Sequence, residues 1–270
     1  MGGTACGNLA PRGTLMDRLT LRGGIAFIWL FTGLAVLHPF YRSVGGLYLA
    51  RLSLPDGLMY AACVAEVVLG LCVLLFPPRL WMTALQLAMI AAFTLILAVT
   101  EPELLVNPFG VLSKNVTLAA LIVTAQLVES EGWTGEARRV LLGGLAFIWA
   151  WEGVMACALF QGPTLREVLA FTGLETEQLR LLLIVAGIGQ ALGGVALLML
   201  RGPWLRLLLG LQAVGLLLIC VLVTRYEPRL WFHPFGPVSK NVPLILGTLL
   251  AFSREPLASA SPTRLPEARG

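Results

Sequence analysis

Long apolar stretches recur along the chain and predict its secondary structure. About 20 consecutive apolar residues are needed for a helix to cross a membrane, and each stretch is close to that length. Strands of a membrane barrel would alternate apolar and polar residues, whereas runs such as 181–185 are apolar throughout. The pattern therefore predicts eight transmembrane helices. Each stretch carries at most one charged residue, and together they cover residues 23–41, 57–78, 80–100, 111–128, 140–165, 181–200, 207–224 and 238–253.

The composition agrees with this pattern. Of the 270 residues, 57% are hydrophobic and 13% are charged, and the mean hydropathy is +0.84. Soluble domains carry about 25% charged residues, and disordered chains combine low hydrophobicity with high charge. Both classes are excluded, and an all-α integral membrane protein is predicted.

The segments outside the apolar stretches indicate a topology. Residues 1–22 are polar and lack the order of a cleaved signal peptide, so we expect the first span to be retained. Residues 254–270 are rich in Pro, Ser, Ala and Arg and are predicted to be disordered. Eight spans place both termini on one side, and a small excess of Arg and Lys on that side favours cytoplasmic termini of a cell-membrane protein.

The chain also repeats itself. Residues 23–29 return as 143–149, and the string at 107–116 returns in similar form at 233–242. The sequence thus predicts two tandem four-helix units, at 23–128 and 140–253. Because each unit has an even number of spans, the units are expected to be parallel repeats about an axis along the membrane normal.

The repeated string supplies the first candidate site. Ser113 and Ser239 are predicted to cap the helix that follows. The next residue is a lysine, in a first turn where the helix dipole disfavours a cation, which suggests a nearby anion. Glu101, Glu227, a phosphate, a sulfate, a carboxylate or a quinone oxygen would serve. The alternative is that the lysines extend to the lipid headgroups. The candidate ligand-binding residues are Ser113, Lys114, Asn115, His233, Ser239, Lys240 and Asn241.

The fourth span of each unit is also the shortest, and in transporters short segments at matching positions point to a binding site. Two carboxylates, Glu66 and Glu152, lie within apolar spans. They either bond a neighbouring helix in protonated form or take part in proton or ligand binding. In the repeat, Glu66 aligns with Gln190, and Glu152 aligns with Thr32.

Other chemistry is weakly indicated. His38 and His233 each precede Pro-Phe; paired haem ligation is less favoured than a place at the membrane interface. None of the five cysteines forms a C-x-x-C motif, which argues against structural zinc. Gly189 and Gly193 are spaced for close helix packing.

Several of these strings resemble the DoxX-like family of four-helix membrane proteins. The resemblance spans the chain from about 21 to 253, as a tandem duplication of a usually single unit. This chain departs from the family pattern in two places. Family members often carry Glu at the position of Gln190. They also often carry Lys shortly after the Gly of the first helix, whereas apolar residues follow Gly33 and Gly153 here. The strings that carry it lie at 147–153, 169–174, 189–194 and 227–243.

The resemblance implies a membrane partner of redox enzymes or an assembly factor, since the family takes its name from a subunit of a thiosulfate:quinone oxidoreductase. Three hypotheses follow. The first is a membrane subunit or partner of a quinone-linked redox system, with quinone near Lys114 and Lys240. The second is a proton-coupled transporter of small solutes that uses Glu66 and Glu152. The third is a non-catalytic scaffold.

Overall fold

The computed structural model describes residues 14–106, 110–158 and 173–255, and every element within these ranges is helical. The predicted all-α class is therefore confirmed. The first half contains α1 (Leu15–Leu34), η1 (Ala35–Leu37), α2 (Pro39–Arg51), α3 (Gly57–Leu75), α4 (Leu80–Thr100), α5 (Glu103–Val106) and α6 (Val111–Glu131). The second half contains α7 (Gly135–Ala158), α9 (Thr176–Met199), α10 (Gly202–Tyr226), η3 (Pro228–Phe232) and α11 (Asn241–Arg254).

Seven of these helices, α1, α3, α4, α6, α7, α9 and α10, are long and apolar enough to cross a membrane. The protein is a multi-pass membrane protein. The eighth predicted span corresponds to α11, which has 14 residues and is therefore about 21 Å long. Its partner in the repeat, α6, has 21 residues. The prediction that both fourth spans are short is therefore wrong for the first half.

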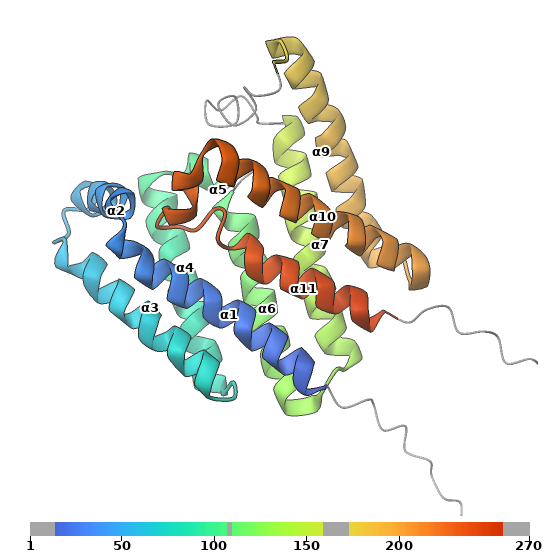
Figure 1. Ribbon diagram of the computed structural model, residues 1–270, viewed down its shortest axis with the longest axis horizontal. Coiled ribbons are helices and arrows are strands. Elements are labelled where there is room, and N and C mark those ends of the chain that lie inside the picture. The colour runs from blue at the N-terminus through green and yellow to red at the C-terminus, as the bar shows by residue number, and fades with distance from the viewer. Residues whose placement is uncertain (1–13, 107–109, 159–172, 256–270) are drawn as a thin grey trace, which may run out of the picture.

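Helices from the two halves lie side by side at the centre of the molecule (Figure 1). Helix α1 packs against α3, α6 and α11, and α7 packs against α9, α6 and α11. The first helix of each half thus contacts the fourth helix of the other half. The main apolar core lies among these central helices and includes Ile25, Leu121, Leu145 and Leu244.

Helix α1 begins eight residues before the charge-free stretch that predicted it. Thr14 and Asp17 form a capping box, which satisfies two of the free N–H groups at a helix start. Asp17 also accepts a hydrogen bond from Nε of Arg254 at 2.9 Å. This contact places the start of α1 beside the end of α11, on one side of the molecule.

The first two long helices of each half approach closely through glycines. A Cβ on Gly33 would lie 2.6 Å from the Cys63 carbonyl oxygen, and one on Gly153 would lie 2.4 Å from the Gly187 carbonyl oxygen. Gly70 and Gly194 lie at similar close approaches further along. The predicted contact glycines Gly189 and Gly193 are not among them, because no atom would lie within 3.8 Å of a Cβ at either position.

Candidate functional site

The repeated lysines lie inside the protein, where α6 and α11 begin. Lys114 is only 2% exposed, and its Nζ donates to the carbonyl oxygen of Pro237 in the other half. The charge that acts on it most strongly is that of Glu152, on α7. Ser113 donates to Oε1 of Glu152 at 3.0 Å. Glu152, in the second half, therefore lies close to the start of α6, with a charge that opposes that of Lys114.

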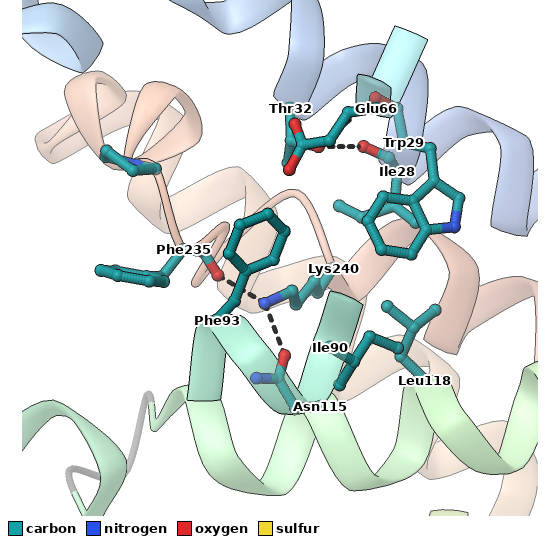
Figure 2. Close-up of a pocket in the computed structure, with 11 residues that line it drawn as sticks. Ile28, Trp29, Thr32, Glu66, Ile90, Phe93, Asn115, Leu118, Phe235 and Lys240 are labelled. Carbon is teal, nitrogen blue, oxygen red and sulfur yellow. Dashed lines mark hydrogen bonds between the residues drawn. The ribbon is translucent and has the colours of Figure 1, made fainter. Parts of the chain in front are cut away.

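Lys240, in the second half, contacts residues of the first half in the same way. Its Nζ donates at 2.6 Å to Oδ1 of Asn115 and at 2.6 Å to the carbonyl oxygen of Phe235 (Figure 2). Asn115 is held in place by its own bond to Thr94 Oγ1, at 2.8 Å. Glu66, on α3, is the carboxyl whose charge acts on Lys240. Each lysine thus faces a carboxyl group from the opposite half of the chain.

The turn before α11 positions the two accepting carbonyls. Gly236 has a φ of 57°, a left-handed conformation that glycine adopts without steric cost. The chain reverses there, so that the carbonyl of Phe235 reaches Lys240 and that of Pro237 reaches Lys114. The matching residues 107–109 lie outside the described residues.

Several predictions for these residues need correction. The lysines do not extend to the headgroups, because Lys240 is only 8% exposed and Lys114 still less. Ser113 does not cap α6, since its hydroxyl donates to Gly110 and Glu152. Ser239 precedes the capping position of α11, and its buried hydroxyl bonds none of the residues that the structure describes.

The anions that the sequence proposed for the lysines pair with arginines instead. Glu101 binds Arg51, and Glu227 binds Arg229 at 2.7 Å. Both pairs are formed with residues close to the ends of their helices. The carboxyls that face the lysines are those of Glu66 and Glu152, which sequence analysis had treated as a separate feature.

Glu66 connects the lysine network to a cavity. Thr32 and Glu66 line the same small void, the Thr32 hydroxyl donates to the Ile28 carbonyl oxygen at 2.8 Å, and Oε2 of Glu66 has no hydrogen-bond partner among the described residues. A void of about 20 Å³ lies between Glu66 and Lys240, which is room for one water molecule. On its other side, Glu66 lines a larger pocket.

That pocket has a volume of about 290 Å³ and lies between α2, α3, α4 and the segment before α11. Its walls are apolar except for Glu66 and two phenols, Tyr41 and Tyr48. Burial, with the charge of Glu66, raises the pKa of Tyr41, and burial, with that of Glu101, raises the pKa of Tyr48 to about 12. Both phenols stay protonated at neutral pH, as hydrogen-bond donors.

The two histidines lie beside the same segment. Nδ1 of His38 accepts from the backbone N–H of Phe40 at 3.2 Å, and Nδ1 of His233 accepts from that of Phe235 at 3.3 Å. His38 also stacks on Phe232, with ring centroids 4.2 Å apart. Burial and the charge of Lys240 lower the pKa of His233 to about 4, so this imidazole is neutral at pH 7. Both rings position backbone turns.

A buried tryptophan–glutamine pair occurs in each half but differs between them. In the first half, Trp29 Nε1 donates to Gln86 Oε1 at 2.9 Å. In the second half, Trp149 Nε1 and both polar side-chain atoms of Gln212 are buried and have no partner in the part of the chain that the structure describes. Sequence analysis did not select these residues as a site. The available signal was that Gln86 and Gln212 are 126 residues apart, the same offset as the repeated strings at 107–116 and 233–242.

This difference predicts opposite effects for one substitution. Gln86→Leu is expected to lower the free energy of unfolding by about 1–3 kcal/mol, because it leaves the buried Trp29 N–H without an acceptor. Gln212→Leu is expected to leave it unchanged or raise it, because two unpartnered atoms are removed. Thermal unfolding of both variants in detergent, without added lipid, provides the measurement. Equal destabilisation would contradict the prediction.

Comparison with known protein families gives one match in each half of the chain. A model described as the DoxX-like family matches residues 26–123 and 146–249. The two matched segments agree with the predicted repeat and confirm the predicted family. No curated protein and no solved structure matches the chain.

Proposed function

The chain belongs to the DoxX-like family, and we propose that it is a membrane subunit of a redox system that binds the ring of a quinone-type molecule. The pocket beside Glu66 carries this proposal. Its volume of about 290 Å³ is close to the lower limit of small-molecule sites, about 300–1,000 Å³. Such sites are mainly apolar, with a few convergent polar groups that fix orientation.

The chemistry of the pocket suits an uncharged ring with carbonyl oxygens. The phenols of Tyr41 and Tyr48 offer O–H donors to those oxygens, and Phe93, Ile96 and Met59 provide apolar surface for the ring. Lys240 is separated from the pocket by Glu66, which lines both the pocket and the small void beside the lysine. In this proposal Lys240, Asn115 and Glu66 hold the polar end of the pocket in place.

The proposed topology follows the repeat. Each half contributes four membrane helices, α11 being the short eighth, and the halves are related by an axis along the membrane normal. The contact between Asp17 and Arg254, which joins the start of α1 to the end of α11, supports an even number of crossings. We place the N- and C-termini of this cell-membrane protein in the cytoplasm. Its proposed partner is a redox enzyme.

Filling the pocket is expected to abolish quinone binding. Ala62 lines the pocket, so Ala62→Phe places a ring where the ligand would lie and should weaken binding of decylubiquinone at least tenfold. Ala61→Phe is the matched control, since its side chain is exposed and is outside the lining of this pocket. Fluorescence titration of the purified protein measures both. Equal affinity in Ala62→Phe and wild type would overturn the proposal.

The crossed lysine–carboxyl pairs favour proton-coupled transport as a second candidate. Repeat-built transporters place their sites between repeats, and Glu66–Lys240 and Glu152–Lys114 each join the two halves. Solute flux into proteoliposomes that requires a pH gradient and is lost in Glu66→Gln would favour transport. Stable recovery of one protein partner from both Glu66→Gln and Lys240→Met would favour a scaffold.

A further inference from the structure

The second half of the chain contains a pocket with no charged lining residue, separate from that beside Glu66. It has a volume of about 280 Å³ and lies between α7, α9 and α10. Trp149, Gln190 and Gln212 supply its polar groups, and Ala186, Leu208 and Leu211 supply apolar surface. The glycines at 189 and 193 line it too, which explains why no side chain fills the space.

Two of the three polar residues that line this pocket, Trp149 and Gln212, carry buried groups without a hydrogen-bond partner among the described residues. Gln212 is only 3% exposed, yet within residues 14–106, 110–158 and 173–255 neither its amide nitrogen nor its oxygen has a hydrogen-bond partner, and the buried Trp149 N–H has none there either. Unpaired polar atoms in a low-dielectric interior cost about 1–3 kcal/mol each. The equivalent groups in the first half, Trp29 and Gln86, bond each other directly. The four-helix unit can therefore fold without leaving these groups unpaired. A ligand that bonds these groups would remove it.

The position of the pocket indicates where its ligand comes from. Trp149, Gln190 and Gln212 lie near the middle of α7, α9 and α10, which are candidate membrane spans. Leu211, which lines the pocket, is 61% exposed, and Ile188 and Leu192, which adjoin the lining residues 189 and 193 on α9, are 50% and 65% exposed. Exposed apolar side chains at mid-span face lipid tails, so entry is from the bilayer.

These features define the ligand class. Two amides and an indole N–H offer donors and acceptors together, and a charged headgroup would find no counter-charge at this depth. We propose that the pocket is a lateral binding site for an uncharged, lipid-soluble molecule that carries hydroxyl and carbonyl groups. The site is distinct from the proposed quinone pocket, with which it shares no lining residue.

The experiment uses 1,2-dioleoylglycerol as the probe, because it is uncharged and carries one hydroxyl and two ester carbonyls. The full chain is labelled with 5-fluorotryptophan and placed in phosphatidylcholine nanodiscs, and Trp149→Phe assigns the fluorine signal of Trp149. We expect this signal to shift saturably as dioleoylglycerol is added. Dioleoylphosphatidic acid, with the same acyl chains and a charged headgroup, should leave it unmoved, as should aqueous glycerol.

Two variants locate the site. Gly189→Leu adds a side chain to the pocket lining at a position where a Cβ would meet no described atom within 4 Å. Gly143→Leu is the matched control, since Gly143 is equally open at its Cβ and lies outside the pocket lining. Gly189→Leu and Gln212→Leu should each weaken binding about tenfold or more, and Gly143→Leu should bind as wild type does. The proposal is overturned by an unmoved Trp149 signal, by an equal response to phosphatidic acid or glycerol, or by unchanged binding in Gly189→Leu.

Discussion

Glu152→Leu is expected to lower the free energy of unfolding by about 3–5 kcal/mol, the cost expected when a buried lysine loses the carboxyl that opposes its charge. Lys114 would then lie in the interior with bonds to neutral groups such as the Pro237 carbonyl but without the carboxyl that opposes its charge. Ser113 would also lose an acceptor. Unfolding of the detergent-solubilised protein by added SDS measures the difference.

A double-mutant cycle separates this pairing from general damage to the core. Lys114→Met removes the charge while keeping a long apolar side chain. If the two groups stabilise each other, Lys114→Met/Glu152→Leu should be less destabilised than the sum of the single variants, by about 1–3 kcal/mol. Strictly additive losses would show that Lys114 and Glu152 are not coupled.

Gly153→Ala is expected to have the second large effect. A Cβ at this position would lie 2.4 Å from the backbone nitrogen of Ala191 and 2.4 Å from the carbonyl oxygen of Gly187. Both atoms belong to the backbone of α9, so α7 and α9 would have to move apart. Overpacking of this kind costs about 1–3 kcal/mol, and occasionally more.

The control for this variant is Gly143→Ala, on the same helix. No atom lies within 4 Å of a Cβ there, so the change should be neutral or stabilising by up to about 1 kcal/mol through helix propensity. Thermal unfolding of the two variants gives the comparison. Similar unfolding temperatures would contradict the close α7–α9 packing.

The helices were predictable because lipid leaves the backbone few choices. A segment without water must satisfy its own N–H and C=O groups, so each apolar stretch had to be a helix. Boundaries were less predictable where distant contacts determine them. Helix α1 extends back to Leu15 because Asp17 both caps it and binds Arg254, a partner that hydropathy does not reveal.

The site residues were predictable as a set, but their pairing was not. The repeat identified Lys114 and Lys240, and polarity within apolar spans identified Glu66 and Glu152. Sequence proximity then suggested Glu101 and Glu227 as the anions, whereas the fold exchanges partners between the halves. The alignment of Glu152 with Thr32 contained the missing signal, because Thr32 lies beside Glu66. Each half thus supplies one carboxyl that faces a lysine of the other half, Glu66 from α3 and Glu152 from α7.

The pockets were beyond sequence reasoning for a related reason. Gly189 and Gly193 have the spacing of a helix contact, but α9 uses Gly187 and Gly194 against α7, and the predicted pair lines an open pocket instead. Which face of an all-apolar helix meets its neighbour depends on packing with several helices at once. Hydropathy does not distinguish those faces.

The most direct test of the proposed function is the quinone content of the protein purified from its own membranes in mild detergent. Organic extraction followed by mass spectrometry gives moles of quinone per mole of protein, and the same preparation shows which proteins accompany it. We predict near-equimolar quinone and a redox enzyme with the wild type, and quinone lost in Ala62→Phe but retained in Ala61→Phe. Only bulk lipid and no redox partner, or the same quinone content in all three proteins, would contradict the assignment.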